Sequence, residues 1–333
     1  MVKNMRITWN PWLTKYYKQI IQHYNTHKLH HSIIIESCNI KDTFKLIWAI
    51  SKWILCIKKK KMKNCGICKG CKLTLTHNNP DFYVLYPKKN KKFIDIETIR
   101  NTINNIVQTS QQYGNKILWI PKYQTLTNFG INALLKIIEE PPKNTWFFIG
   151  NDKFYKLNIT FRSRCLLYQI LQPIEDIGLN WIQKNIIIPK KICLTSLRIN
   201  NYSPELAIDF LQSSSYKLRD NLCMKLYYAI DNNNFSKLLP IINDHQAILK
   251  IQWIILLLLD AMKIKKKLSL LLDNLDQIHL IKKISTQYSY YNLHKIIKYW
   301  IKCKYQLINI ENINYELLIL NQLLKWEKFF IFN

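Results

Sequence analysis

The sequence has few glycines, few acidic residues and no long apolar run. Only 6 of its 333 residues are glycine and 10 are proline. No apolar stretch reaches the roughly 18 residues that a membrane-spanning helix needs, and the longest candidate, Ile251 to Leu259, ends at Asp260. The opening MVKNMRITWNPW lacks the continuous apolar segment of a secretory signal. These absences argue against a membrane-spanning or secreted protein, and we expect a cytoplasmic one.

The shortage of acidic residues leaves a strongly basic chain. Lysine and arginine number 49 against 21 aspartates and glutamates, so the formal net charge is +28. Such an excess normally indicates a nucleic-acid partner, because basic side chains displace counterions from phosphate. An A/T-rich genome, however, also moves neutral surface positions toward lysine. Charge alone therefore leaves DNA contact open, and we interpret the runs Lys58–Lys61 and Lys265–Lys267 as solvated surface.

The apolar content predicts a large core in two or three domains, since 48% of the residues are hydrophobic. Up to about residue 169, short β-branched runs alternate with helical periodicity, which predicts βαβ units around a parallel sheet. The runs are Ile33–Ile35, Phe82–Tyr86, Ile117–Ile120 and Trp146–Ile149. From Pro173 to about Leu211 we expect a small helical unit. From Ser213 to Asn333 apolar residues recur every three or four positions, which predicts an all-helical segment.

Four of the nine cysteines gather in the segment CIKKKKMKNCGICKGC, as Cys56, Cys65, Cys68 and Cys71. Two successive gaps of two residues let thiolates converge from a tight turn, which Gly66 and Gly70 permit, and a fourth sulfur can reach from the preceding helix. Four sulfurs leave no open coordination position, so we predict a structural Zn²⁺ site in the loop 56–71. Free thiols, or disulfides that a reducing cytoplasm disfavours, are the alternatives. The isolated cysteines are interpreted as ordinary core or near-surface residues: Cys38, Cys165, Cys193, Cys223 and Cys303.

The predicted strand Ile33–Ile35 runs into ESCNIKDTF and then a helix, which is where a phosphate-binding loop with the pattern GxxxxGK[ST] would lie. None of the required residues is present. Ser37 and Asp42 stand at the glycine positions, Thr43 at the lysine position and Phe44 at the hydroxyl position. Without glycine the backbone N–H groups cannot close around a phosphate, and the Asp42 carboxylate would repel it.

The predicted strand Ile117–Ile120 also lacks the acidic residues that an ATPase places at its end. An ATPase ends such a strand with acidic residues that hold Mg²⁺ and orient a water, but here Pro121 and Lys122 stand at those positions. The phosphate loop and the acidic site are independent losses. Together they predict a chain that neither binds nor hydrolyses ATP.

These features together resemble the family of delta-prime subunits of the bacterial DNA polymerase III clamp loader. The combination of NALLK, EEPP and SRC is specific to clamp-loader ATPase-like subunits, and the lost phosphate loop separates delta-prime from its hydrolysing relatives. The matching segments are NPWL at Asn10–Leu13, His31, the four cysteines, NPDFYVL at Asn79–Leu85, IETIR at Ile96–Arg100, NALLKIIEEPP at Asn132–Pro142, WFFIG at Trp146–Gly150 and FRSRC at Phe161–Cys165. The C-terminal part matches only in helical character and in YSPELA, where Tyr202 and Glu205 replace the two glycines of the family's Gly-Ser-Pro-Gly.

The resemblance implies an α/β P-loop-NTPase-like (AAA+) domain at 1–169, a small helical lid domain at 170–211 and an all-α collar domain at 212–333. It further implies a hetero-pentameric ring with gamma/tau-type ATPase subunits and the clamp-opening delta subunit. Such a ring loads the sliding clamp onto primed DNA as part of the DNA polymerase III holoenzyme. The chain itself is then a rigid, non-hydrolysing subunit.

In the family the arginine of the SRC motif projects into the ATP site of the neighbouring subunit, and here that residue is Arg164. An arginine fork neutralises charge on a γ-phosphate and can be supplied in trans. The alternative role for Arg164 is a surface salt bridge. Asn151 stands where active relatives place a hydroxyl that senses the γ-phosphate, and LLKIIEEPP is first a buried helix that Pro141 ends. An active gamma-type ATPase and a stand-alone zinc-containing DNA-binding protein remain as alternative functions.

Overall fold

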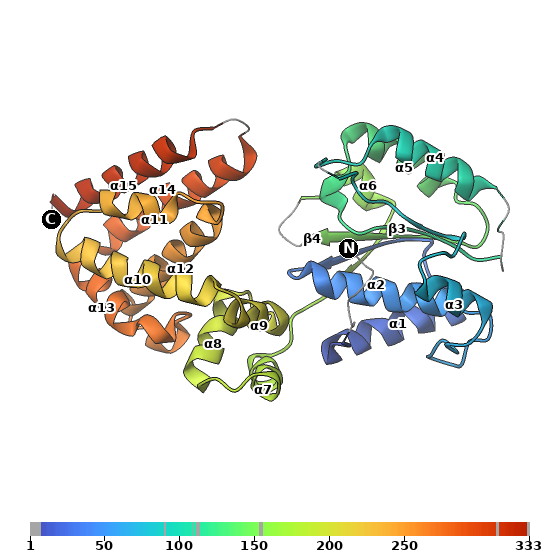
Figure 1. The fold of residues 1–333 in the computed structure, drawn as a ribbon, viewed down its shortest axis with the longest axis horizontal. Coiled ribbons are helices and arrows are strands. Elements are labelled where there is room, and N and C mark those ends of the chain that lie inside the picture. Colours follow the sequence, from blue (N-terminus) through green and yellow to red (C-terminus); the bar gives the residue numbers. More distant parts are fainter. Residues whose placement is uncertain are drawn as a thin grey trace. The chain divides into compact units, whose positions relative to one another are not determined.

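The computed structural model describes residues 8–331 except for 90, 109, 111–113, 153–155 and 311–312. The chain divides into two compact units, Met1–Gln172 and Pro173–Asn333, which we call the N-terminal and C-terminal units (Figure 1).

The N-terminal unit is built on a sheet of five parallel strands in the order β2-β3-β4-β1-β5. The strands are β1 (Ser32–Ser37), β2 (Phe82–Val84), β3 (Lys116–Ile120), β4 (Thr145–Asp152) and β5 (Leu166–Gln169). Because all strands are parallel, their carboxyl ends meet at one edge, which is where open α/β sheets bind ligands. The first four strands confirm the predicted runs; β5 was not predicted.

Helices cover both faces of this sheet, as Figure 1 shows. One face carries α1 (Thr14–Asn25), α2 (Ile40–Ile54) and α3 (Lys69–Leu75), and the other carries α4 (Ile96–Val107), α5 (Asn128–Glu139) and α6 (Ile159–Ser163). In β1, Ile33 and Ile35 join the core under α1 and α2, whereas Ile34 joins the core under α4 and α5. A strand buried on both faces needs apolar residues at every position, which explains the continuous apolar runs. Short 3-10 turns complete the unit at Pro11–Leu13 and Tyr123–Thr125.

In the C-terminal unit every regular element among the described residues is helical, as the periodicity predicted. The first three helices are α7 (Glu175–Asn185), α8 (Lys190–Ile199) and α9 (Pro204–Gln212). The others are α10 (Ser215–Asp231), α11 (Leu239–Ile242), α12 (Ala247–Lys265), α13 (Ile278–Gln287), α14 (Tyr290–Asn309) and α15 (Tyr315–Ile331), with 3-10 turns at Ser236–Leu238, Ser269–Leu271 and Leu275–Gln277. Within the described ranges, no helix combines the length and apolarity needed to cross a bilayer.

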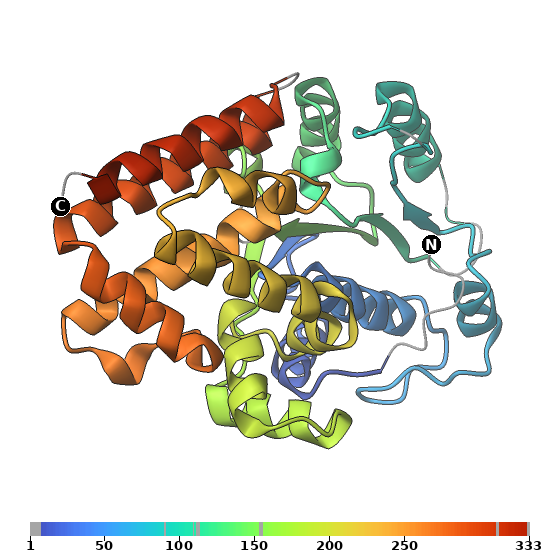
Figure 2. The same cartoon turned by 60° about the vertical axis from the view of Figure 1, so that its left-hand side comes forward.

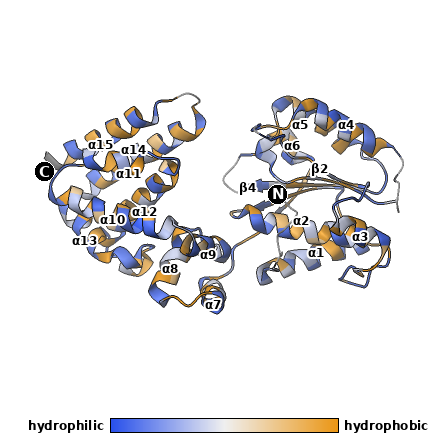
Figure 3. Ribbon diagram, viewed as in Figure 1, coloured by the Kyte–Doolittle hydropathy of each residue, from blue (hydrophilic) through white to orange (hydrophobic). Residues whose placement is uncertain are grey.

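The helices of the C-terminal unit enclose two apolar clusters. A small cluster joins α7, α8 and α9, and a larger one is built around α12, which packs along α13 and α14. Figure 2 shows α14 and α15, in orange and red, lying along each other, and Figure 3 shows apolar and polar residues mixed along the helices of this unit. The segment after α12 is bonded to α8, because Arg198 Nη1 donates to the Leu272 carbonyl and the Asp276 N–H to Thr195 Oγ1. The division of this unit into a lid and a collar at residue 211 therefore stays a prediction.

The turn between α8 and α9 forms without the two glycines of the family pattern. Asn201 and Tyr202 take left-handed backbone angles, with φ of 56° and 59°. The Tyr202 N–H donates to the Leu197 carbonyl at 2.9 Å, which closes the end of α8. Ser203 then caps α9 and Pro204 occupies its first turn. Capping therefore maintains the turn, although a tyrosine stands at a position that favours glycine.

Candidate functional site

The turn from β1 into α2 is an ordinary capped helix start. The Asn39 side chain accepts from the Lys41 N–H at 3.0 Å, and the Ser37 hydroxyl accepts from the Asn39 N–H at 3.1 Å. The Asp42 N–H donates to the Asn39 carbonyl at 3.0 Å. In a phosphate loop such N–H groups point at the ligand. Here these three N–H groups are bonded within the turn.

Asp42 turns toward the N-terminal segment. Its side chain is fully buried and accepts from Asn10 Nδ2 at 2.6 Å, while the buried Lys45 Nζ donates to Asn10 Oδ1 at 3.1 Å. Asn10 belongs to the NPWL motif just before α1. This buried network compensates a carboxylate that would otherwise be costly to desolvate. Asp42 therefore fixes the start of the chain to α2.

Thr43 and Pro121, which replace the phosphate-binding lysine and a metal-binding acid, meet at Gly150 of β4. A Cβ built on Gly150 would lie 2.2 Å from the Pro121 carbonyl oxygen and 3.0 Å from Thr43 Cγ2. The Thr43 hydroxyl is buried and has no hydrogen-bond partner in the part of the chain that is described. The Pro121 backbone and the Thr43 methyl group therefore pack closely against β4 at Gly150.

The other two altered positions and Asn151 differ in burial. The Phe44 ring packs on Trp119 of β3, with ring centroids 4.7 Å apart, and so joins the core. Lys122 is exposed. Asn151 is fully buried in β4 and pairs in register with Glu36 of β1. Phe44 and Asn151 are therefore packed into the domain, whereas Lys122 faces solvent.

Arg164 lies between α6 and β5 and is partly exposed. Its Nε forms an ion pair with a carboxylate oxygen of Glu139, the last residue of α5, and its Nη1 donates to the Thr160 carbonyl at 3.1 Å. Within the single chain Arg164 thus makes the surface salt bridge that the sequence left as an alternative. Sequence reasoning treated Glu139 only as part of a helix end. The partner was not foreseen because contact between α5 and α6 depends on the tertiary fold.

The four clustered cysteines converge as predicted. All four Sγ atoms lie within 4.8 Å of one another. Three of the separations are 3.6 Å for Cys56–Cys65, 3.9 Å for Cys56–Cys68 and 3.9 Å for Cys65–Cys71. A tetrahedron with Zn–S bonds of about 2.3 Å has S–S edges of about 3.8 Å. The cluster therefore has the size of a four-thiolate metal site.

Backbone N–H groups point at the sulfur atoms. Cys65 N donates to Cys56 Sγ and Cys68 N to Cys65 Sγ, both at 3.3 Å, and Cys71 N donates to Cys68 Sγ at 3.4 Å. Burial raises the pKa of the Cys56 thiol to about 12. At Cys68 burial also acts to raise the pKa, but the backbone N–H groups of Cys71 and Ile57 outweigh it and lower the pKa to about 6. Such N–H donors orient and stabilise thiolate ligands of a metal.

The two glycines of this loop act differently from each other. Gly66 has a φ of 78°, so it provides the sharp turn that the sequence predicted. Gly70 has no such angle. A Cβ there would lie 2.4 Å from the Leu55 carbonyl oxygen, so glycine is needed for the close approach of α3 to the end of α2. Gly70 was predicted to permit a sharp turn, but it instead allows two segments to pack closely.

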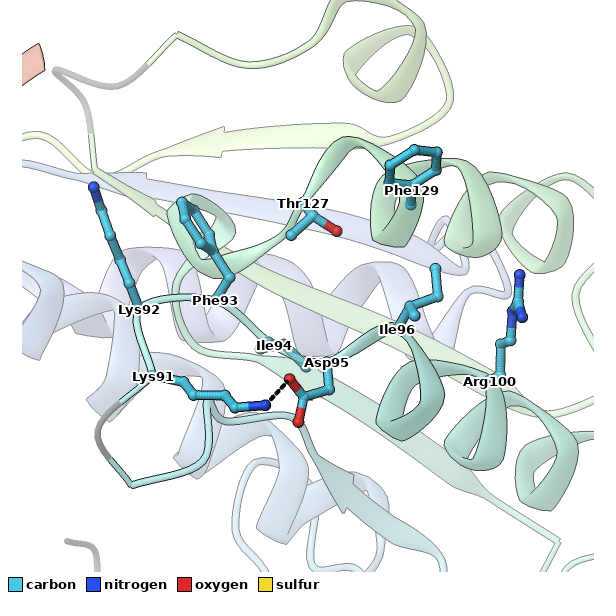
Figure 4. Close-up of a pocket in the computed structure, with 9 residues that line it drawn as sticks. All are labelled: Lys91, Lys92, Phe93, Ile94, Asp95, Ile96, Arg100, Thr127 and Phe129. Carbon is cyan, nitrogen blue, oxygen red and sulfur yellow. Dashed lines mark hydrogen bonds and ion pairs between the residues drawn. The ribbon is translucent and has the colours of Figure 1, made fainter. Parts of the chain in front are cut away.

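A groove on the α4 and α5 side is separate from these sites. One cavity of about 570 Å³ and an adjoining one of about 530 Å³ share Ile96, Arg100 and Phe129. Figure 4 shows the first of them, with Phe129 at its rim and Lys91 paired to Asp95. Its lining residues include none of the positions at the β1–α2 turn. The groove is therefore a surface feature outside the nucleotide-binding edge.

The strand order defines a class, a P-loop-NTPase-like α/β domain. The loss of its phosphate-binding residues stays a prediction. Family models described as "DNA polymerase III, delta subunit" and "DNA polymerase III, delta subunit, C terminal" match residues 12–174 and 213–328. The DNA polymerase III subunit delta' of Buchnera aphidicola subsp. Schizaphis graminum is 43% identical over 97% of this chain and 98% of its own length.

The subunit of the same name from Escherichia coli (strain K12) is 30% identical over 96% of each chain. A solved gamma subunit-related protein of Thermotoga maritima covers 96% of this chain with 15% identity and a TM-score of 0.44, which is too weak a likeness to argue from. Because these relatives are 30–43% identical over nearly the whole chain, the chain belongs to the family of delta' subunits of DNA polymerase III.

Proposed function

We propose that the chain is a subunit of a clamp loader that neither binds nor hydrolyses ATP. The observation that carries this proposal is the close packing of Pro121 and Thr43 against Gly150 at the sheet edge, at positions where an ATPase needs an acid and a lysine. The bonded N–H groups of the β1–α2 turn support it further, because they provide no open cradle for a phosphate. A domain that keeps the sheet and loses the ligands retains its shape for contacts with other subunits.

Arg164 is the residue that we propose to act in trans. It follows the last residue of α6, and its side chain is 39% exposed. Its guanidinium group can therefore be reached from the surface of a domain that, in our proposal, has no phosphate ligands of its own. An arginine supplied by a neighbour stabilises the charge that develops on a transferring γ-phosphate. The proposed recipient is a gamma/tau-type ATPase subunit.

The proposed assembly is a hetero-pentamer of this chain with ATPase subunits and a clamp-opening delta subunit, which together load the sliding clamp onto primed DNA. The C-terminal unit is all helical among its described residues, which is consistent with a collar domain that holds the ring together. The helices α7 to α9 are the proposed lid. The names of the relatives, subunits of DNA polymerase III, support the same assignment.

We also propose that the cysteine cluster holds one structural Zn²⁺. The four sulfur atoms lie within 4.8 Å of one another, close enough to share one ion, and four thiolates leave no position for a substrate or water. The ion would fix the loop between α2 and α3, because Cys56 follows one helix and Cys71 lies in the other.

Arg164→Ala in a reconstituted complex tests the function. We expect hydrolysis at the site that receives Arg164 to fall by on the order of 10³- to 10⁵-fold, with the ring still assembled. Total ATPase would fall only in part, because other sites draw their arginines from other subunits. The measurement is ATPase and clamp loading with clamp and primed DNA present, at equal assembly.

The matched control is Arg162→Ala, which removes an exposed arginine from the same short helix. We expect this variant to behave like the wild type. If Arg164→Ala left both turnover and loading unchanged, Arg164 would be only a surface salt-bridge residue and the protein only a scaffold.

A further inference from the structure

Glu139 and Arg164 are held together by two anchored helix ends. Glu139 ends α5, whose neighbouring residues Leu134 and Ile138 are buried in the core. Arg164 follows α6, which is fixed by the fully buried Phe161 and capped by Asn158. Both side chains therefore extend from backbone that packing fixes, so their ion pair is a property of the fold rather than a chance encounter of two flexible segments.

The pair uses one edge of the guanidinium group. Arginine has five N–H bonds. The Nε bond goes to Glu139 and one Nη1 bond goes to the Thr160 carbonyl. Three N–H bonds on Nη1 and Nη2 have no partner among the residues that the structure describes. Two anchors on the chain's own atoms thus fix the plane of the group while its outer end can still donate.

We propose that Glu139 is a positioning residue for Arg164: it holds the guanidinium in one orientation so that the free N–H bonds meet the γ-phosphate of the neighbouring subunit. This inference rests on the proposed function of Arg164. An arginine side chain without an anchor samples many rotamers, and only a fraction of them place its fork on a phosphate. Fixing the orientation beforehand raises the rate, because the ordering cost is met before the transition state.

Glu140 offers a natural comparison. It follows Glu139, it is exposed, and it forms no ion pair among the described residues. Removing it deletes the same charge from the same chain segment but leaves Arg164 anchored. Glu139→Gln supplies the conservative change, since an amide oxygen still accepts from Nε but carries no charge.

The experiment is a double-mutant cycle in the reconstituted complex, with the other ATPase subunits made hydrolysis-deficient so that only the site facing Arg164 turns over. We expect Glu139→Ala to lower kcat about fivefold with ATP affinity unchanged, since a partly exposed ion pair supplies about that factor. Glu139→Gln is expected to fall between Glu139→Ala and the wild type, and Glu140→Ala to match the wild type. In the Arg164→Ala background, Glu139→Ala should cause no further loss, because Glu139 acts only through Arg164.

The outcomes separate the two claims. An unchanged Arg164→Ala variant would overturn the proposed function, and this inference with it. A strongly impaired Arg164→Ala variant beside a wild-type Glu139→Ala variant would overturn the positioning role alone. If the two losses of kcat multiplied in the double variant, Glu139 would act independently of Arg164, and the positioning role would be overturned. A lowered melting temperature of Glu139→Ala would then assign Glu139 a structural role in α5.

Discussion

At the scale of single residues, Arg219 of the C-terminal unit is a charged residue among the largest fully buried side chains. Its side chain is fully buried and its fork donates to both oxygens of Asp276, at 2.5 and 3.0 Å, and to Asn274 Oδ1 at 2.7 Å. Asn274 in turn donates to Asp260, which is also fully buried. The network ties α10 to α12 and to the segment after it. The Nε of Arg219 has no hydrogen-bond partner among the described residues, but both Nη atoms are bonded, so removing the side chain leaves its acceptors without a donor.

We predict that Arg219→Met destabilises the chain by about 3–5 kcal/mol, because Asp276 and Asn274 then lose their partner in a region with little water. Arg198→Met is the matched control. Arg198 is 15% exposed and pairs with Glu175, which is 31% exposed, so its loss should cost less, about 1 kcal/mol. Denaturant unfolding of the two variants checks the order. Equal losses would show that burial does not set the strength of these pairs.

Residue-scale predictions from sequence succeeded where the partners are close along the chain. The cysteines of the metal cluster lie within one short segment, so their spacing alone indicated a common site. Arg219 and Asp276 are 57 positions apart, and nothing in either local sequence indicates the other. The pairing of Arg164 with Glu139 is of the same kind, because it is created by the packing of α5 and α6.

At the scale of elements, continuous apolar runs were the signal that predicted strands. Every residue of β3 is buried, so the strand appears in the sequence as a continuous apolar run. In β5 only Tyr168 of the four residues is buried, because β5 lies at the edge of the sheet. β2 lies at the opposite edge and none of its three residues is buried, yet it was predicted, so edge position alone does not explain why β5 was missed. The α5 helix, by contrast, was predicted from its apolar spacing and from the proline that ends it, and its apolar residues are buried in the core.

For the zinc loop we predict one Zn²⁺ per chain in freshly purified, reduced protein. Cys68→Ser should lose the metal and loosen the loop 56–71 without unfolding the unit, because the sheet has its own core on both faces. Metal analysis and hydrogen exchange of the loop measure the two effects. Cys38→Ser, outside the cluster, should keep the metal. Wild-type protein without zinc would remove the assignment.

At the scale of the whole molecule, the chain keeps the parallel sheet of a P-loop-NTPase-like domain, and we propose that the carboxyl edge of this sheet binds no nucleotide. The fold class could be predicted because long apolar patterns determine the sheet and the helices. The state of the edge could be predicted only in part. The sequence predicted which ligands are missing, but the close packing of Pro121 and Thr43 against Gly150 required the three-dimensional arrangement.

The packing at this edge leads to the last prediction: the whole chain does not bind ATP at millimolar concentration, and Thr43→Lys alone does not restore binding. A lysine supplies one charge, but a phosphate also needs open backbone N–H groups, and those of Asn39, Lys41 and Asp42 are bonded within the turn. The longer side chain would also have to displace contacts near Gly150.

Calorimetric titration of both proteins with ATP and Mg²⁺ makes the measurement, with an ATP-hydrolysing clamp-loader subunit as the positive control. Circular dichroism of Thr43→Lys shows whether the variant remains folded, so that absent binding is not mistaken for unfolding. Micromolar affinity of the unmodified chain would contradict the prediction and favour an active gamma-type ATPase. Binding by folded Thr43→Lys alone would mean that the missing charge, rather than the occupied N–H groups, is what excludes the nucleotide.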